Sequence, residues 1–255
     1  MSPWVTKLLF ITRSSASYMA LAGALTALGW LALRLEALPS VQIRPWELES
    51  APLVIVDAGH GGQDGGAVAG GLIEKDLSLT LARQVRAHLE KAGIRVRMTR
   101  DKDRFLELEE RCQIAAEAKA DAFVSVHLNT NPAAEIHGIE TYFSTTQSLM
   151  ARTAKAAART KSTATGEQLA QIIQRQVCAA TKAEDRGIKD SQLIVVMRTP
   201  CPAALVECGF LTNADEARRM KREDYQQSLA KGIAEGMVEF LRGRVVVPAA
   251  VAKVP

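Results

Sequence analysis

Two histidines and a glutamate have the types and the placement of metal ligands. His60 lies in the glycine-rich stretch 57–62, Glu74 follows that stretch, and His127 ends the apolar run 123–127. Two imidazoles and one carboxylate are a ligand set of catalytic zinc sites, in which water takes the fourth position. Water bound to such a zinc ion has a pKa of roughly 7 and supplies hydroxide at neutral pH. The three residues therefore predict a metal-activated water.

A fourth residue, Glu207, is a candidate proton shuttle for such a water. It follows the apolar run 203–206, where a lone carboxylate is costly unless it is paired or put to use. A carboxylate beside an activated water can take up its proton and pass it on. With this residue, the pattern indicates a metal-dependent hydrolase.

Each candidate ligand also has an ordinary structural explanation. His60 could be a turn histidine that bonds to the backbone, and His127 a satisfied core histidine at a strand end. Glu74 could be a cap or dipole partner before a helix. No single one of these residues is decisive, but their joint placement favours a site.

Strands that alternate with helices are expected to position these residues. Buried strands predicted at 53–56, 122–126 and 203–206 each end shortly before one of the site residues. Further strands are predicted at 94–98, 139–143 and 193–197, and helices at 77–89, 108–115, 169–180 and 225–240. This alternation predicts an α/β fold, a mostly parallel sheet sandwiched by helices. Because sites in such sheets gather at the carboxyl ends of strands, the three strand ends are expected to converge.

Local patterns also predict how two helices begin. Asp76 is expected to cap the helix that follows it. Asn213 and Glu216 have the spacing of a capping box. In this motif the side chain of each residue accepts a hydrogen bond from the backbone N–H of the other.

Composition bounds the class of protein. The chain has 255 residues, of which 24% are charged and 47% hydrophobic, which suits one globular domain with an additional segment. The net charge is +4, aromatic residues are 5%, and no basic motif is interleaved with aromatic residues. Nucleic acid is therefore not expected as a partner.

Cysteine placement argues against two classes of site. The four cysteines form no C-x-x-C pair, so neither a zinc ribbon nor a thioredoxin-like site is supported. Disulfides are permitted but not required. Cys112 lies on the apolar face of a predicted helix, and we expect a buried free thiol there.

Composition divides the chain into segments. Residues 1–38 contain an uncharged apolar stretch, 14–33, whose helical length at about 1.5 Å per residue matches a bilayer core of roughly 30 Å. We therefore expect a signal or membrane-anchor segment, with an ordinary core helix as the alternative. Residues 39–52 are interpreted as a linker, 53–243 as the catalytic domain and 244–255 as a flexible tail.

Several motifs resemble those of the zinc-dependent N-acetylmuramoyl-L-alanine amidases and occur in the order found in that family. The resemblance covers roughly residues 53–242. The matching segments are 54–62, 74–76, 125–129, 185–189 and 202–213. Leu128 and Cys208 depart from the family pattern, since a smaller residue is usual at the first position and a small or polar one at the second. Neither departure removes a ligand.

The resemblance implies that His60, Glu74 and His127 bind Zn²⁺ and that Glu207 is the catalytic carboxylate. It also implies the substrate, which is the peptidoglycan amide between the lactyl group of N-acetylmuramic acid and the L-alanine of the stem peptide. An enzyme with this substrate acts in the cell envelope, in a periplasmic or extracytoplasmic location. Residues 14–33 would then associate it with the inner membrane, and a regulatory activator protein is an expected class of partner.

Three assignments remain open from the sequence. Arg186 and Asn129 are candidate substrate-binding residues, although Arg186 could instead form a structural salt bridge. The stretch 147–165 carries basic and no acidic side chains, and could bind the anionic wall or be a solvated loop. The whole chain could also be a non-catalytic wall-binding or regulatory protein with this fold, or a zinc peptidase that acts on wall peptides.

Overall fold

The computed structural model describes residues 51–147 and 165–244 of the chain. The apolar segment 14–33, most of the predicted linker, residues 148–164 of the basic stretch and nearly all of the tail lie outside the described residues. In the described part, no helix combines the length and the apolar character that a membrane crossing requires.

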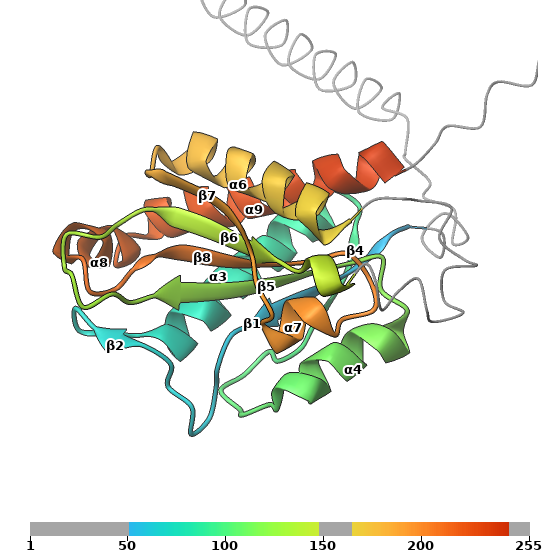
Figure 1. Cartoon of the computed structure of the whole chain (residues 1–255), viewed down its shortest axis with the longest axis horizontal. Coiled ribbons are helices and arrows are strands. Elements are labelled where there is room, and N and C mark those ends of the chain that lie inside the picture. Colours follow the sequence, from blue (N-terminus) through green and yellow to red (C-terminus); the bar gives the residue numbers. More distant parts are fainter. Residues whose placement is uncertain (1–50, 148–164, 245–255) are drawn as a thin grey trace, which may run out of the picture. The chain divides into compact units, whose positions relative to one another are not determined.

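A six-stranded sheet forms the centre of the domain, with the strand order β4-β1-β5-β8-β6-β7 (Figure 1). Its strands are β1 (Leu53–Ala58), β4 (Arg95–Met98), β5 (Ala122–Asn129), β6 (Ile139–Phe143), β7 (Asp185–Asp190) and β8 (Ala203–Phe210). The first four strands in this order run parallel, and β6 is antiparallel to β8 but parallel to β7. The prediction of a mostly parallel α/β sheet is confirmed.

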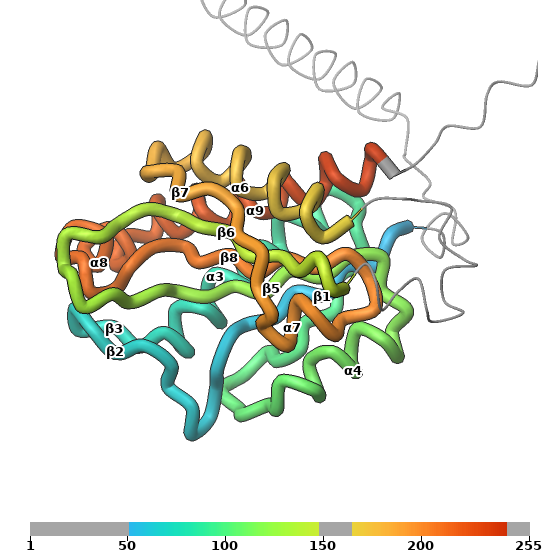
Figure 2. Tube along the Cα trace, in the orientation of Figure 1, coloured from blue at the N-terminus to red at the C-terminus, as the bar shows by residue number. Residues whose placement is uncertain are grey.

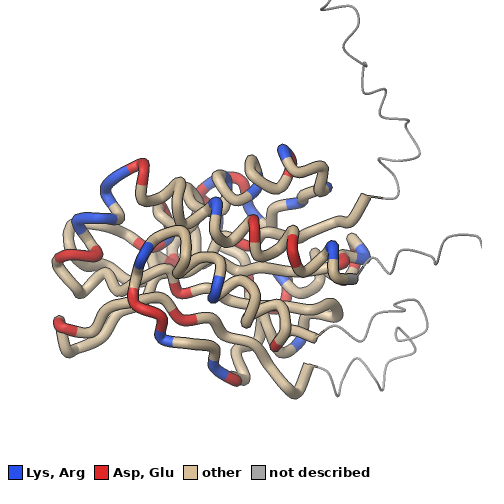
Figure 3. Tube along the Cα trace, turned by 90° about the horizontal axis from the view of Figure 1, so that it is seen from above, with Lys and Arg blue, Asp and Glu red and all other residues tan. Residues whose placement is uncertain are grey.

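Helices cover both faces of the sheet, as Figures 1 and 2 show. One face carries α3 (Glu74–Lys91), α6 (Gly166–Thr181) and α9 (Glu223–Arg244), and the other carries α4 (Leu108–Ala118) and α7 (Ile194–Met197). The remaining elements are α8 (Ala214–Met220) and the hairpin of β2 (Val68–Ala69) and β3 (Leu72–Ile73). Charges of both signs are interspersed along the chain (Figure 3).

Alternation along the strands explains the two cores. In β1, Val54 and Val56 join the core under α3, α6 and α9, whereas Ile55 joins the core under α4 and α7. Successive side chains of a strand point to opposite faces, so a fully apolar run suits a sheet that is covered on both sides. Burying both faces fixes the register of the strands that carry the site.

Three local predictions are wrong. Residues 194–197 of the predicted strand 193–197 form the short helix α7, because a short apolar run does not by itself distinguish a strand from a helix. Asp76 lies in the first turn of α3, whose N-cap Ile73 makes no side-chain capping bond. Asn213 does cap α8, but Glu216 does not complete a capping box, because its carboxylate accepts from the backbone N–H groups of Phe210 and Gly138.

The four cysteines all lie in the described residues, and none of them forms a disulfide there. Cys112 is buried, as predicted, and so are Cys201 and Cys208. Burial raises the pKa of the Cys112 thiol. These thiols behave as small apolar groups of the core.

Candidate metal centre and active site

The sheet brings the predicted site residues to one edge. His60 follows the end of β1, His127 lies near the end of β5, and Glu207 lies near the end of β8. Glu74 is the first residue of α3. The predicted convergence of three strand ends is therefore observed, and a helix start supplies the fourth residue.

The side chains of the three predicted ligands point at one another. The Nε2 atom of His60 lies 3.0 Å from Oε1 of Glu74, and Nδ1 of His127 lies 2.8 Å from the same oxygen. One ligand atom from each residue lies within 4.8 Å of the others. Such an arrangement leaves three protein donors around one point, which is the donor set that zinc takes in open, catalytic sites.

The imidazole of His60 is oriented by a carboxylate that the sequence did not single out. Its Nδ1 lies 2.8 Å from Oδ2 of Asp64, which leaves Nε2 for a metal. Burial opposes protonation of His60, but the neighbouring Glu74 and Asp64 carboxylates outweigh it and raise the pKa of His60. A carboxylate on the far nitrogen is the usual partner of a histidine that binds a metal, because it fixes the tautomer and the ring orientation.

The carboxylate of Glu74 is held from both sides. Its Oε2 accepts from the N–H of Ala67 at 2.8 Å, and its Oε1 accepts from the N–H of Leu128 at 3.0 Å. Burial opposes ionisation, but hydrogen bonds from His127 and His60 hold the pKa of Glu74 well below its ordinary value. The site therefore contains a charged carboxylate between two imidazoles, which suits a cation.

Two glycines make room for this cluster. A Cβ atom on Gly59 would lie 2.3 Å from Cε1 of the His127 ring. A Cβ atom on Gly66 would lie 2.5 Å from Oε2 of Glu74 and 2.6 Å from Cδ2 of His60. These two glycines thus let the backbone approach the ligands closely, which a solvated turn does not require.

Glu207 lies beside the cluster with an unsatisfied oxygen. It is the register partner of His127 on the neighbouring parallel strand, so both side chains leave the same face of the sheet. Its Oε2 is buried and has no hydrogen-bond partner among the described residues. Burial, with a smaller contribution from the Glu74 and Glu140 carboxylates, raises the pKa of Glu207 to about 7. A carboxyl group with this pKa can both take and give a proton near neutral pH.

A second carboxylate, Glu140, lies beside Glu207 on the neighbouring strand β6. It is paired in register with Glu207 and is buried. Its Oε1 accepts from the side-chain amide of Asn129 at 3.0 Å, and its Oε2 accepts from Nε of Arg186 at 2.9 Å and from Nζ of Lys189. Both predicted substrate-binding residues are thus brought together on one carboxylate, and the salt bridge considered for Arg186 is present.

The sequence profile of the N-acetylmuramoyl-L-alanine amidases matches residues 54–239. The chain belongs to this family. The match spans every residue of the cluster, so the resemblance described above is confirmed, together with the expected class of enzyme, a peptidoglycan hydrolase.

The similar proteins include one that is much longer than this chain and two solved chains that the match covers almost completely. LytC, an N-acetylmuramoyl-L-alanine amidase of Bacillus subtilis, is 35% identical over 189 residues, which are 74% of this chain and 35% of LytC. The chain thus spans about a third of that relative's length. The crystal structure of an N-acetylmuramoyl-L-alanine amidase from Clostridium difficile 630 is 34% identical, with a TM-score of 0.67 over 75% of this chain and 97% of that one. The CwlD amidase from Clostridioides difficile, in complex with the GerS lipoprotein, is 27% identical, with a TM-score of 0.65 over 75% and 99%.

Glu140 could have been found in the amidase sequence by the argument that was used for Glu207. It lies in the predicted strand 139–143, where an unpaired buried carboxylate is costly. Asp64 carries no such signal, because an aspartate in a glycine-rich turn is ordinary.

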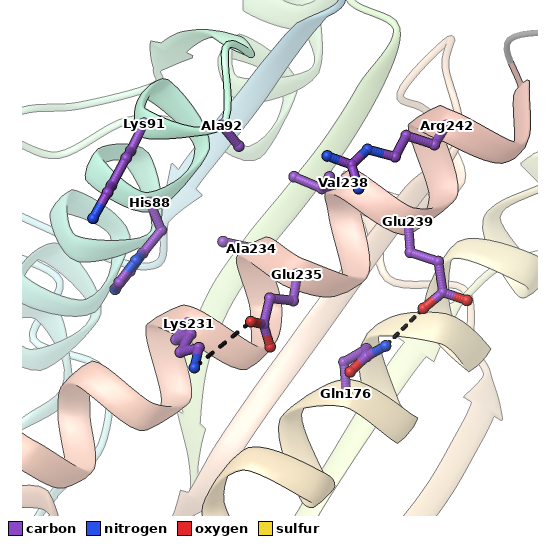
Figure 4. A pocket seen from close by; sticks show the side chains of 10 residues that line it. All are labelled: His88, Lys91, Ala92, Gln176, Lys231, Ala234, Glu235, Val238, Glu239 and Arg242. Atoms are coloured by element: carbon purple, nitrogen blue, oxygen red, sulfur yellow. Dashed lines mark hydrogen bonds and ion pairs between the residues drawn. The ribbon is translucent and has the colours of Figure 1, made fainter.

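A groove of about 710 Å³ lies away from the cluster of His60, Glu74, His127 and Glu207. Its lining residues come from the end of α3 and the residue after it, from α6 and from α9 (Figure 4). Its charged groups are partly paired with each other, as in Lys231 with Glu235, and Gln176 donates to Glu239. His88 lines the groove and is half-buried. The groove contains none of the candidate site residues.

Proposed function

We propose that this amidase hydrolyses the bond between N-acetylmuramic acid and the L-alanine of the stem peptide with a zinc ion held by His60, Glu74 and His127. The observation that carries the proposal is the convergence of their three donor atoms beside a buried carboxylate, Glu207, that lacks a partner among the described residues. A zinc ion bound there would act as a Lewis acid on the amide carbonyl and would lower the pKa of the attacking water.

Glu207 moves the proton in this proposal. Its carboxylate takes a proton from the attacking water, holds it on the buried side chain and delivers it to the nitrogen of the leaving L-alanine. In the chain without a metal, burial raises the pKa of the Glu207 carboxyl to about 7, which favours a group that can hold a proton between the two steps. The bond that breaks is the carbonyl carbon to nitrogen bond, and the products are a free lactyl carboxylate and a free amine.

Arg186 and Asn129 contact the substrate in this proposal, with Glu140 as their common support. Arg186 is 25% exposed, lies over the ring of Phe210 at 5.1 Å, and uses Nε for Glu140. Its Nη1 donates to the carbonyl of His137 at 3.4 Å, and Nζ of Lys189 donates to the same Glu140 carboxylate. Stem peptides carry carboxylates, and a guanidinium is a suitable partner for them.

The remaining parts of the proposal concern the envelope. The substrate lies outside the cytoplasmic membrane, so we propose that residues 14–33 export the chain or anchor it at the inner membrane. Residues 1–38, 39–52, 53–243 and 244–255 then serve as anchor or signal, linker, amidase domain and tail. The GerS complex of the CwlD relative supports a protein partner as a further proposal.

Product analysis tests the proposed reaction. The purified chain, loaded with zinc, is incubated with isolated sacculi and the products are identified by mass spectrometry. Intact stem peptides with a free L-alanine amine, released from intact disaccharides, support the proposal. Shortened peptides would identify a zinc peptidase, and binding without products would identify a wall-binding protein; either result contradicts it.

A further inference from the structure

Two buried arginines, Arg100 and Arg111, surround the turn that carries His60. They are 2% and 3% exposed. A buried guanidinium is costly unless its donors are satisfied. The hydrogen-bond partners of these two side chains are therefore informative about what the arginines do; only Nε of Arg111 has none among the described residues.

Three consecutive carbonyl groups of the turn accept hydrogen bonds from these guanidinium groups. Arg100 donates from Nε to the oxygen of Ala58 at 3.0 Å and from Nη2 to that of Gly59 at 2.7 Å. Arg111 donates from Nη1 to Ala58 at 2.7 Å and from Nη2 to His60 at 2.8 Å. The backbone before and at the first predicted ligand is thus held by charge-assisted bonds, which are stronger than neutral ones.

Arg100 also connects the turn to the helix that carries the glutamate ligand. Its Nη2 donates to the carbonyl of Lys75 at 2.8 Å, directly after that glutamate. The N–H of Gly59 donates to the carbonyl of Val126 at 3.1 Å, directly before the second histidine ligand. The backbones next to all three ligands are therefore linked through Arg100 and Gly59.

Arg111 is itself fixed by a fully buried carboxylate. Asp57 accepts from Nη1 of Arg111 at 2.8 Å and from the hydroxyls of Thr99 and Ser125, each at 2.6 Å. A guanidinium is a planar fork with donors in fixed directions, so anchoring one nitrogen on Asp57 aims the other at the turn.

The turn has a conformation that needs such support. The φ angle of His60 is 59°, which is uncommon for a residue other than glycine. A residue held there is strained, and the conformation persists only where the surroundings enforce it. The carbonyl of His60 is one of the groups that Arg111 holds.

We propose that Arg100 and Arg111 are positioning residues of the metal site. They fix the backbone of the His60 turn so that Nε2 of His60 faces the other two donors before a metal binds. The inference rests on the proposed zinc site and adds how the fold prepares it.

Arg100→Lys tests this inference, because lysine keeps the charge but lacks the fork that reaches Gly59 and Lys75 together. In the purified full chain, we expect the zinc Kd, measured by competition with a chromophoric chelator, to rise about 10- to 100-fold, as is typical when a group that orients a ligand is lost. The visible spectrum of the Co²⁺-substituted chain should change as well, and activity should recover at saturating zinc.

Matched variants separate positioning from general stability. Thr199→Val removes a buried hydroxyl that donates to the carbonyl of Val195 at 2.6 Å, outside the network of Asp57 and the two arginines. Its zinc Kd should therefore stay within about twofold of wild type while its unfolding free energy falls. If Arg100→Lys does not fold by circular dichroism, Ser78→Ala replaces it. Ser78 donates to the same Gly59 carbonyl at 2.8 Å, and its loss should weaken zinc binding about 2- to 10-fold.

The possible outcomes are distinct. A folded Arg100→Lys chain with the wild-type zinc Kd and Co²⁺ spectrum overturns the inference, and so does an equal weakening in Thr199→Val. If Ser78→Ala has to be used, a wild-type Kd in that variant overturns it. A wild-type chain that binds no zinc would instead remove the proposed metal site itself.

Discussion

His127 and Glu207 are register partners on the neighbouring parallel strands β5 and β8. Strand pairing therefore places a predicted metal ligand and the predicted proton shuttle side by side on one face of the sheet. Glu140, the register partner of Glu207 on β6, extends the row to the substrate-binding candidates. The sheet sets the distances between these three side chains and holds them more rigidly than a loop would.

Glu207→Ala should separate hydrolysis from metal binding. Glu207 is expected to move protons and not to bind the metal, so the variant should keep about one zinc per chain while its turnover of sacculi falls by roughly 10²- to 10⁴-fold. Elemental analysis and product release measure the two quantities. Loss of zinc in a folded variant would show that Glu207 is a ligand.

Glu207→Gln should change how the stability of the zinc-free chain depends on pH. The folded pKa of about 7 exceeds the ordinary value of 4.5, so the stabilising contribution of the neutral carboxyl is complete below about pH 4.5 and is lost as the pH rises through 7. Above that, the variant should be more stable than wild type by on the order of 1–3 kcal/mol, at about 1.4 kcal/mol per pKa unit. Urea unfolding measures the difference at each pH, and parallel pH profiles for the two chains would contradict the burial argument.

Gly59→Ala should weaken the metal site through crowding. The new Cβ would lie 2.3 Å from Cε1 of the His127 ring, so the ring must move, at a cost of about 1–3 kcal/mol. We expect lower zinc affinity and lower stability in thermal unfolding with and without zinc. Gly243→Ala is the control, because its Cβ meets nothing within 4 Å. Equal behaviour of the two variants would mean that the ring can shift freely.

Arg186→Ala should raise KM for solubilised muropeptides about 10- to 100-fold, with less effect on kcat, because one charged hydrogen bond contributes about 1.5–3 kcal/mol. Zinc content should not change. Arg198→Ala, which removes an exposed pair with Glu109, serves as the control. If Arg186→Ala lowers the unfolding temperature but leaves KM unchanged, the salt bridge with Glu140 is structural only.

The sequence could predict the elements that end at the site, because apolar runs and glycine turns are local signals. His60, His127 and Glu207 stand just after or at the end of such runs, so their approach follows from the sheet alone. Strand β7 has no apolar pattern of its own, since it is an edge strand defined by pairing with β6. The support of the His60 turn by Arg100 and Arg111 joins residues about forty to fifty positions apart, and no local pattern announces such contacts.

The same limit applies to the substrate-binding candidates. Arg186 was identified by its motif, but the carboxylate that orients it lies on another strand. Lys189 was identified only as part of that motif, although it shares this carboxylate. The partner of a charged side chain depends on which strands are neighbours in the folded sheet. Here the order β8-β6-β7 places Arg186 and Lys189 of β7 next to Glu140 of β6.

Zinc titration of the metal-free chain tests the central claim most directly. The chain is stripped with a chelator and given increasing zinc, and release of stem peptides from sacculi is measured at each step. Activity should be absent without metal and rise linearly to a plateau at about one zinc per chain, whereas His127→Ala should need far more zinc or remain inactive. Full cleavage by the metal-free wild-type chain, or a plateau reached equally well by His127→Ala, would contradict the account.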